Sequence, residues 1–266
     1  MAAITVHADY GSDFTKLTFQ YFVHADQYGW SYNTYSTRMG TRSDRFEGRG
    51  FELSEDMRLQ DGVVTKWSVS DPGLLRFSIA GLVISAAKVT AAAITQSQAD
   101  DRALIASFFA GNDTFVGGNL ADVIKLHAGD DTADGGRGAD TLYGGPGSDA
   151  LTGGAGADDL FGEGGRDTFV YKSVSESTIT ARDTIFDLQA GDRISLLSID
   201  ANTKVAGNQA FSFIGKSAFH GTAGELRYVL KDSDTYIYGD VNGDKKVDFS
   251  IHLDDAVTVT KDYFIL

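Results

Sequence analysis

Aspartate recurs at every ninth residue along the middle of the chain. The series has seven members, Asp113, Asp122, Asp131, Asp140, Asp149, Asp158 and Asp167. Most of them lie in glycine-rich nonapeptides in which an apolar residue follows two positions after the aspartate, as Leu142 follows Asp140. A flexible acidic linker has no reason to keep such a spacing. The repeat therefore predicts a solenoid rather than a linker.

Each nonapeptide combines the groups that a calcium ion needs. A hard cation such as Ca²⁺ is bound by about six to eight oxygen atoms, which carboxylates and main-chain carbonyls can supply. Glycine has no Cβ, so it can adopt positive φ and bring its carbonyl close to an ion. The last residues of each repeat have room for a short strand with one inward-facing apolar side chain. We therefore expect two nonapeptides to form one turn of a right-handed parallel β-roll.

In such a roll, residues eighteen apart would stack in columns, because two nonapeptides make one turn. One column would hold Asp113, Asp131, Asp149 and Asp167, and the other Asp122, Asp140 and Asp158. Counting the stacked pairs predicts about five calcium ions, each between two layers. The thin core would consist of two apolar columns, Phe115, Ala133, Leu151 and Phe169 on one side and Ile124, Leu142 and Leu160 on the other.

The glycines of the repeats complete the predicted metal sites. They are Gly111, Gly129, Gly135, Gly136, Gly138, Gly144, Gly145, Gly147, Gly153, Gly154, Gly156 and Gly165. Three irregularities interrupt the pattern. Leu120 and the pair Leu126-His127 replace glycines near the start, and Glu163 replaces one near the end. We expect the first sites to bind calcium more weakly for this reason.

Charge is concentrated in the same segment. The chain has a formal net charge of −14, of which residues 110–170 contribute eleven acidic and three basic side chains. Without cations, such a segment repels itself and has little apolar surface to offset the loss of chain entropy. Nucleic acid is a poor partner for it. We expect the repeats to stay unfolded where calcium is scarce and to fold outside the cell, where calcium is abundant.

Residues 110–266 resemble a known family. The nonapeptides are similar to the calcium-binding repeats of RTX proteins. The stretches Asp167 to Tyr171, Arg182 to Ile194, Ala210 to Gly215 and Gly239 to Phe249 resemble the C-terminal domain of serralysin-type metalloproteases. The resemblance implies a β-roll continued by a mostly antiparallel β-sandwich, and secretion by a type I ABC exporter that reads an uncleaved C-terminal signal. Ser195 departs from the aspartate that is common in the family.

Features of the two ends agree with such export. The first residues have neither a basic region nor a continuous apolar region, so we expect no Sec signal peptide. The ending Asp262-Tyr263-Phe264-Ile265-Leu266 resembles the family's terminal signal, although an ordinary last strand would look similar. The chain has no cysteine, which excludes disulfides and thiolate chemistry. No apolar run is long enough to predict a membrane span.

A second calcium site is possible in the loop that contains Asp240, Asn242, Asp244 and Asp248. These oxygen-bearing side chains occupy positions one, three, five and nine of a pattern that resembles the start of an EF-hand loop. Ile251 stands where the EF-hand has its bidentate glutamate. The alternative is a polar hairpin whose side chains hydrogen-bond to the backbone.

The sequence carries no recognisable catalytic motif. No His-Glu-x-x-His occurs, and the five histidines are scattered singly, so a zinc protease site lacks its ligand spacing. No Gly-x-Ser-x-Gly occurs either. Asp9, Asp13, Asp26 and His24 could form a site on paper, but nothing in the sequence fixes their geometry.

Residues 1–109 read as a small antiparallel β domain with short capping helices. Strands are predicted at Phe14 to Val23, Trp30 to Tyr35, Asp44 to Leu53, Val63 to Val69 and Leu74 to Ile79, with turns at Asp61-Gly62 and Asp71-Pro72-Gly73. Helices are predicted at Ser85 to Ile94 and Asp100 to Phe109, where they would cover the open end of the roll. The aromatic residues Tyr21, Tyr28, Trp30, Tyr32 and Tyr35 suit either a glycan-binding face or ordinary hairpin packing.

The sequence thus predicts a mainly β chain of three parts, an N-terminal β domain (1–109), a calcium roll (110–170) and a serralysin-like β domain (171–266). The leading hypothesis is a secreted calcium-binding RTX protein whose N-terminal domain binds a glycan or another surface ligand. The alternatives are an extracellular hydrolase or lyase with an unrecognised N-terminal site, and an adhesive or matrix protein.

Overall fold

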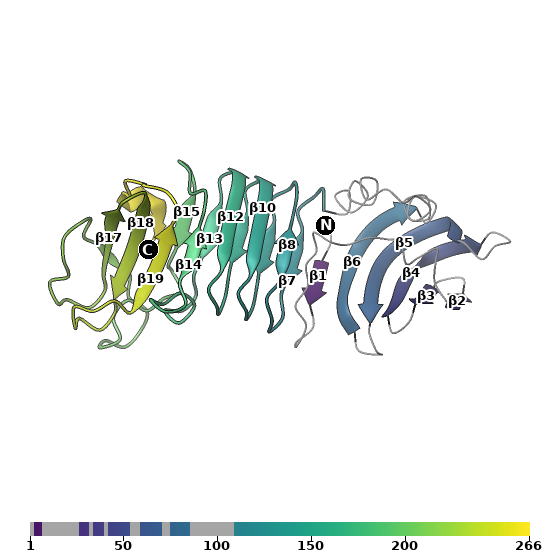
Figure 1. Cartoon of the computed structure of the whole chain (residues 1–266), viewed down its shortest axis with the longest axis horizontal. Coiled ribbons are helices and arrows are strands. Elements are labelled where there is room, and N and C mark those ends of the chain that lie inside the picture. Colours follow the sequence, from purple (N-terminus) through teal and green to yellow (C-terminus); the bar gives the residue numbers. More distant parts are fainter. Residues whose placement is uncertain are drawn as a thin grey trace.

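The computed structural model describes residues 109–266 and, before them, the backbone of six strands within residues 3–85. The molecule is elongated, with strands stacked like rungs along its long axis (Figure 1). Two sheets contain all the described strands. The first has twelve strands in the order β2-β3-β4-β5-β6-β1-β7-β9-β11-β13-β15-β20, and the second has eight in the order β16-β17-β18-β19-β14-β12-β10-β8.

The central part is a two-sheet parallel roll, as the nonapeptide spacing predicts. Successive repeats alternate between the sheets, so that neighbouring strands in one sheet lie eighteen residues apart, as Leu142 and Leu160 do. The strands of the first sheet here are β7 (Thr114–Val116), β9 (Thr132–Asp134), β11 (Ala150–Thr152) and β13 (Thr168–Val170). Those of the second are β8 (Val123–Lys125), β10 (Thr141–Gly147) and β12 (Asp159–Gly165).

The inner face of each sheet is the predicted apolar column. Ala133 pairs with both Phe115 and Leu151, and Leu142 pairs with both Ile124 and Leu160. All seven predicted core residues are at most 1% exposed. The small side chain of Ala133 thus lies between two larger ones, Phe115 and Leu151. The core is confirmed in identity and in register.

Both sheets continue beyond the last nonapeptide. The first sheet adds β15 (Arg193–Ser195) and β20 (Phe264–Ile265), both in parallel pairing, and a 3₁₀ turn at Lys261–Tyr263 precedes β20. The second adds β14 (Asp183–Ile185), β19 (Phe249–Leu253), β18 (Asp234–Asp240), β17 (Glu225–Lys231) and β16 (Ser212–Phe213). Only the pairs β17–β18 and β18–β19 are antiparallel in this part. The expected sandwich is therefore a continuation of the roll's own sheets, with less antiparallel pairing than the family resemblance implied.

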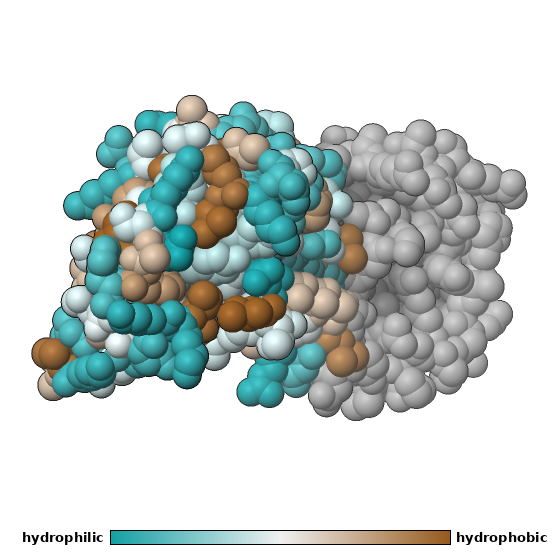
Figure 2. All heavy atoms as spheres, turned by 60° about the vertical axis from the view of Figure 1, so that its left-hand side comes forward, coloured by the Kyte–Doolittle hydropathy of each residue, from teal (hydrophilic) through white to brown (hydrophobic). Residues whose placement is uncertain are grey.

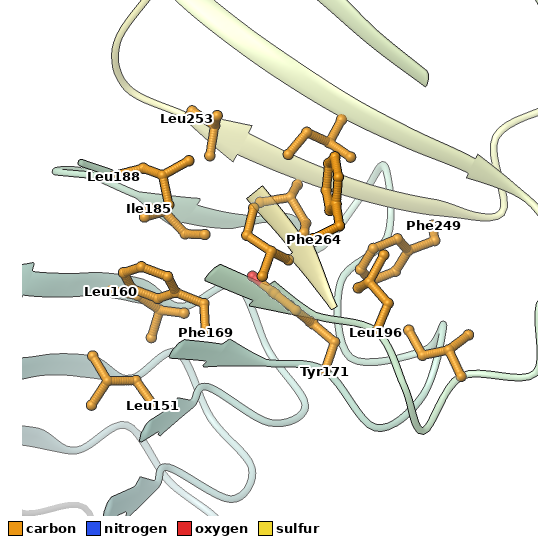
Figure 3. Packing of buried hydrophobic residues seen from close by; sticks show 14 of the residues in the cluster. Leu151, Leu160, Phe169, Tyr171, Ile185, Leu188, Leu196, Phe249, Leu253 and Phe264 are labelled. Atoms are coloured by element: carbon orange, nitrogen blue, oxygen red, sulfur yellow. The ribbon is translucent and has the colours of Figure 1, made fainter. Parts of the chain in front are cut away.

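The buried apolar residues form one cluster that runs from the roll into the C-terminal part (Figure 3). Ile185 and Ile194 extend the two columns of the roll by one layer, and Leu253 and Phe264 extend them by another. Tyr171 and Phe249 meet edge to face at 5.2 Å between ring centroids. The final strand is therefore part of the packed structure, with Phe264 only 8% exposed.

Upstream strands extend the first sheet past the first repeat. β2 (Gln27–Ser31), β3 (Thr34–Met39), β4 (Arg42–Leu53), β5 (Leu59–Ser70) and β6 (Leu75–Ser85) form an antiparallel series. β1 (Ala3–Val6) pairs antiparallel with β6 and parallel with β7, so that Ile4 lies beside Phe115. A strand of the N-terminal part thus continues the roll at the edge where the sequence predicts capping helices.

Several details of the N-terminal prediction differ from the structure. The predicted turn at Asp61-Gly62 is wrong, because both residues lie inside β5, opposite a stretch of β4 where the register shifts. The predicted strand Trp30 to Tyr35 is divided between β2 and β3, which pair as a hairpin. The strand expected at Phe14 to Val23 lies outside the described residues. So do the helices expected at Ser85 to Ile94 and Asp100 to Phe109, apart from Ser85, which ends β6, and Phe109.

The outer surface of residues 109–266 is mixed in character. Three half-buried rings, Tyr143, Phe161 and Phe186, stack on the outer face of the second sheet with centroids 4.5 Å apart. Their faces cover one another, so this ladder stabilises neighbouring strands and presents mainly ring edges to solvent. In the view of Figure 2, hydrophobic side chains form short groups separated by hydrophilic ones. Among the described residues, no helix is long and apolar enough to span a membrane.

Candidate calcium sites of the β-roll

The repeat aspartates are joined into two hydrogen-bonded columns. In each column the main-chain N–H of one aspartate donates to Oδ1 of the aspartate eighteen residues later. The five distances range from 2.7 to 2.9 Å, for the pairs Asp113–Asp131, Asp122–Asp140, Asp131–Asp149, Asp140–Asp158 and Asp149–Asp167. All seven aspartates are at most 2% exposed. The structure thus brings together all the aspartates that the sequence assigned to these sites.

In four of these carboxylates the second oxygen is buried and has no hydrogen-bond donor. This holds for Oδ2 of Asp131, Asp140, Asp149 and Asp158. A buried charged oxygen without a partner is costly, since it has lost its water and gained nothing in return. Such orphaned oxygens, in four successive repeats, indicate that a cation belongs beside them.

Glycine makes the space around three of these oxygens, those of Asp140, Asp149 and Asp158. A Cβ built on Gly135, Gly144 or Gly153 would lie 2.4 Å from Oδ2 of the aspartate five residues later. A main-chain carbonyl of the adjacent layer reaches the same place, because a Cβ on Gly135 would also lie 2.5 Å from the carbonyl oxygen of Gly153. At the next position, a Cβ on Gly145 would lie 1.6 Å from the carbonyl oxygen of His127. Gly145 also has a φ of 107°, a conformation that other residues rarely adopt. Carboxylate oxygens and carbonyls therefore converge where only glycine can stand.

Burial changes the proton affinity of the carboxylates. Loss of water raises the pKa of Asp140 and Asp149 to about 7, against partial compensation by the N–H donor from the previous layer. The same cause raises the pKa of Asp131, Asp158 and Asp167 to about 6. Neighbouring aspartates add to the increase. The roll thus disfavours its own ionised carboxylates unless a positive charge compensates them.

Two further aspartates extend the columns, and the sequence analysis did not assign them. The N–H of Asp158 donates to Oδ1 of Asp183 at 3.1 Å, and that of Asp167 donates to Oδ1 of Asp192 at 3.0 Å. Burial, reinforced by the charge of Asp158, raises the pKa of Asp183 to about 9. A signal was present, because Asp183 and Asp192 are themselves nine residues apart and each precedes an isoleucine by two positions. The inserted residues between Asp167 and Asp183 hid the continuation.

The glycine set is also larger than the sequence analysis assigned. A Cβ on Gly162 would lie 2.5 Å from Oδ2 of Asp167, and one on Gly117 would lie 3.0 Å from Oδ2 of Asp122. Both glycines occupy the same position in their repeats as Gly135 and Gly144. Their position five residues before the aspartate, rather than a perfect nonapeptide around them, places them beside the Oδ2 atom.

Two of the irregular repeat positions show local strain. His127 and Glu163 stand where other repeats have glycine, and they adopt positive φ values of 71° and 63°. For a residue with a Cβ, this conformation costs about 1–2 kcal/mol. Contacts support both residues, since His127 stacks on Phe109 and Glu163 forms a 3.1 Å ion pair with Lys125. The backbone at His127 and Glu163 thus keeps the positive φ of the roll, although glycine is replaced there.

The loop from Asp240 to Asp248 has a different geometry. The buried carboxylate of Asp240 accepts N–H donors from Asn242, Gly243 and Lys245. The carboxylate of Asp248 accepts from the N–H of Val241 and from the side chain of Asn242. Asp244 accepts from the N–H of Lys246 and pairs with its ammonium group at 3.3 Å. These contacts favour the polar hairpin, because donors already occupy the oxygens that an ion would need.

The geometry of the roll defines a class of protein, those built on calcium-binding repeats. The model of the RTX calcium-binding nonapeptide repeat matches residues 109–142. The model of the peptidase M10 serralysin C-terminal domain matches residues 131–265, about half of the chain. The chain therefore belongs to the serralysin C-terminal family, and the resemblance of residues 110–266 is confirmed. Among curated proteins, no sequence matches this chain.

Solved structures with a related sequence include two subunits of a mannuronan C5-epimerase from Azotobacter vinelandii. The AlgE6R3 subunit is 28% identical, with a TM-score of 0.41, and the match covers 55% of this chain and 78% of that subunit. The AlgE6R2 subunit is 25% identical, with a TM-score of 0.41, and the match covers 57% of this chain and 91% of that subunit.

The donor set of the roll fits Ca²⁺. Carboxylate and main-chain carbonyl oxygens are hard ligands, which Ca²⁺ prefers. Asp131, Asp140, Asp149 and Asp158 each have a buried oxygen that lacks a donor, and beside the last three a glycine leaves space that a Cβ would fill. The RTX repeats of this chain bind calcium, as the family does, and these residues would hold it.

Proposed function

We propose that this chain is a secreted protein whose RTX roll folds around calcium outside the cell. The observation that carries the proposal is the row of buried Oδ2 atoms in Asp131, Asp140, Asp149 and Asp158. Without a cation, these desolvated negative charges oppose folding of the roll. With calcium bound, the binding free energy becomes folding free energy. Calcium concentration then decides whether the segment is folded.

The columns supply more interlayer sites than the sequence alone suggests. Adding Asp183 and Asp192 raises the number of vertically adjacent aspartate pairs from five to seven. We infer up to seven ions, with the weakest sites at the ends of the columns. Among the described residues, the hydrogen-bonded series of aspartates stops at each end of a column, so an ion there has another such aspartate pair on one side only.

Export by a type I ABC exporter is the second part of the proposal. The supporting observations are membership of the serralysin C-terminal family and the position of the last residues. Phe264 and Ile265 form a parallel strand on β15, and β15 lies directly beyond the strand that follows Asp167. A chain that has not folded its roll therefore leaves its last residues accessible to an exporter, and folding after export buries them in the sheet.

The N-terminal part, residues 1–109, would carry the ligand specificity of the secreted protein. Its strands β2 to β6 form a continuous antiparallel sheet that is joined to the roll through β1. The aromatic side chains Tyr21, Tyr28, Trp30, Tyr32 and Tyr35, and the residues Asp9, Asp13, His24 and Asp26, lie outside the side chains that the structure describes. A glycan array on the full-length, calcium-loaded protein tests glycan binding.

Two experiments test the calcium and export parts separately. Calorimetric titration of the calcium-free chain should give between five and seven ions with binding coupled to gain of β structure. Fewer than two ions, or binding without a structural change, would contradict the folding role.

Deleting residues 262–266 should abolish secretion in a host with a type I exporter while the purified chain still folds with calcium. Wild-type amounts of the truncated chain in the medium, without lysis, would contradict the export role.

A further inference from the structure

A second cluster of metal-ligating groups lies on the outer face of the C-terminal part, away from the calcium columns. It consists of Asp234, His252 and Asp254, whose ligand atoms all lie within 4.8 Å of one another. Asp234 begins β18, His252 lies in β19, and Asp254 follows β19 directly. These two strands are adjacent and antiparallel (Figure 1). The sequence analysis regarded His252 as one of several scattered histidines.

The register of the two strands explains why the three side chains meet. Tyr236 pairs with His252, and Thr235 pairs with Leu253. Asp234 and Asp254 are the next residues along the two segments, and their ligand atoms lie within 4.8 Å of each other. Thr235 and Leu253 are buried, so alternate residues place Asp234, His252 and Asp254 on the outer face. The N–H of Asp254 donates to the carbonyl of Ile185, which fixes its backbone against β14.

The carboxylates of Asp234 and Asp254 do not pair with any permanently charged basic side chain of residues 109–266. Like charges opposite each other on an antiparallel pair are destabilising. Within the same residues, the basic groups nearby are the imidazole of His252 and the guanidinium of Arg182, which lies 5.1 Å from the centroid of the Tyr236 ring. The charge of Asp254 also reaches Asp159 on β12, whose pKa is raised by burial and by that charge. Negative charge therefore accumulates on this face.

His252 is oriented as a metal-binding histidine would be. Its Nδ1 lies 3.2 Å from the hydroxyl oxygen of Thr184, and its ring stacks on Tyr236 with centroids 4.9 Å apart. When Nδ1 carries the proton and donates it to Thr184, the lone pair of Nε2 is directed at the carboxylates. Nε2 is buried and lies 3.3 Å from Oδ2 of Asp234, so the two atoms form an ion pair when the imidazole is protonated and are neighbouring ligand atoms when Nε2 carries no proton. An outer partner that fixes the tautomer is typical of metal-binding histidines.

The carboxylate of Asp234 is held in place by its neighbours. Its Oδ1 accepts from the hydroxyl of Ser233 at 2.9 Å, and its Oδ2 accepts from the hydroxyl of Tyr236 at 3.3 Å. Both donors are hydroxyl groups, whose hydrogens can rotate away from the carboxylate, unlike the main-chain N–H donors of the loop at Asp240. Asp254 is exposed, so its side chain can turn towards an ion. In a four-coordinate zinc site the ligand atoms lie about 2.0–2.2 Å from the metal. The ligand atoms of the cluster, within 4.8 Å of one another, are therefore close to the spacing that such a site needs.

We propose that Asp234, His252 and Asp254 form a site for a divalent transition metal such as Zn²⁺, with water completing the coordination. One imidazole nitrogen and two carboxylate oxygens suit such a metal better than Ca²⁺, which prefers a shell of oxygen alone. The ion would bind the end of β19 to the start of β18 and neutralise the facing carboxylates. The site is independent of the calcium columns, because it shares no ligand with them.

The test is a Zn²⁺ titration of the full-length protein saturated with Ca²⁺, followed by calorimetry and by the thermal unfolding midpoint. The wild type should bind one Zn²⁺ per chain at this site and gain thermal stability. Asp254→Asn and His252→Gln should weaken this binding at least about tenfold. The control variants Asp255→Asn and His220→Gln, which remove a neighbouring charge and an exposed histidine, should bind as the wild type does.

Asp254→Asn gives a second readout that a purely structural role would not produce. Without Zn²⁺, this substitution should leave the unfolding midpoint unchanged or raise it, because it removes one of two facing charges. With Zn²⁺, the order should reverse, and the wild type should be the more stable. No saturable Zn²⁺ binding in the presence of Ca²⁺, equal binding by Asp254→Asn and the wild type, or loss of binding only in His220→Gln would each overturn the proposal. If His252→Gln does not fold, Asp254→Asn alone decides.

Discussion

The main-chain N–H of Asp140 donates a 2.8 Å hydrogen bond to Oδ1 of Asp158, eighteen residues later in the sequence. Oδ2 of the same Asp158 carboxylate is buried without a hydrogen-bond donor. One oxygen therefore joins two layers of the roll, and the other is available to a cation. A single side chain thus couples the layer structure of the fold to metal binding.

Aspartates inside the columns should matter more for calcium affinity than those at the ends. Asp140, Asp149 and Asp158 each lie between two aspartates of their column, whereas Asp122 has one such neighbour among the described residues. Replacing any of the first three by alanine leaves an ion with fewer ligands and a neighbouring charge uncompensated. We expect the three substitutions to weaken binding more than Asp122→Ala does, as measured by calorimetric titration. Equal losses, or a larger loss for Asp122→Ala, would contradict the stacking.

Asp183 and Asp192 should behave as members of the columns. Each accepts the main-chain N–H of the last repeat aspartate in its column, and each is at most 2% exposed. We expect Asp183→Asn and Asp192→Asn each to reduce calcium affinity or the number of ions bound, because a neutral amide is a weaker calcium ligand than a carboxylate. The exposed Asp255 provides a control, and Asp255→Asn should change neither quantity. If Asp183→Asn and Asp192→Asn both bind calcium as the control does, the columns end at Asp158 and Asp167.

The sequence predicted the roll well because one physical rule repeats in it. Leu142 and Leu160 stack because strict ninefold spacing leaves their strands one register. It did not predict that Ile185 and Asp183 continue the same columns, since the longer connection after Asp167 breaks the period while the layers continue. Nor could it show that β1 pairs with β7, because this parallel contact joins residues over a hundred positions apart that share no local motif.

The proposed metal cluster of Asp234, His252 and Asp254 also could not be predicted from the sequence. Asp234 and His252 are eighteen residues apart, outside the repeat, and they meet only because β18 and β19 pair in one particular register. The loop from Asp240 to Asp248 shows the opposite case. There the sequence pattern suggested an ion, but the carboxylate of Asp240 accepts three backbone N–H groups instead. Spacing identifies candidate ligands, and their hydrogen bonds decide between the candidates.

Glycine should be indispensable only where the layers touch. In Gly145→Ala the new Cβ would lie 1.6 Å from the carbonyl oxygen of His127, at a φ of 107°. The conformation alone costs about 1–2 kcal/mol, and the overlap adds to it by moving a carbonyl of the site. We expect a lower unfolding free energy and weaker calcium binding. Gly164→Ala is the matched control, because nothing lies within 4 Å of its new Cβ, and it should change stability by no more than about 0.5 kcal/mol. Similar losses in both variants would contradict this role of Gly145.

Acid should partly replace calcium in folding the roll. The pKa of Asp140 and Asp149 is raised by burial to about 7 in the folded roll, from an ordinary value of 3.8. The calcium-free folded state therefore binds more protons than the unfolded state, so its stability is greatest below the unfolded pKa and is lost as pH rises through about 7. Lowering the pH of the calcium-depleted protein from about 8 to about 5 should increase its β signal in circular dichroism. An unchanged or smaller β signal at the lower pH would count against the buried, cation-dependent carboxylates.

The most direct test is hydrogen exchange of the main-chain amides of residues 113–167, with saturating calcium and after its removal by a chelator. The amides of Asp113, Asp122, Asp131, Asp140 and Asp149 donate to carboxylates of the next layer. If calcium holds those carboxylates in place, these amides are protected from exchange when calcium is bound. Without calcium they exchange at rates close to those of an unfolded chain, and the β content of the wild type falls. Equal protection of the segment in chelator at low ionic strength would show that the roll folds without the ion, and would contradict calcium-driven folding.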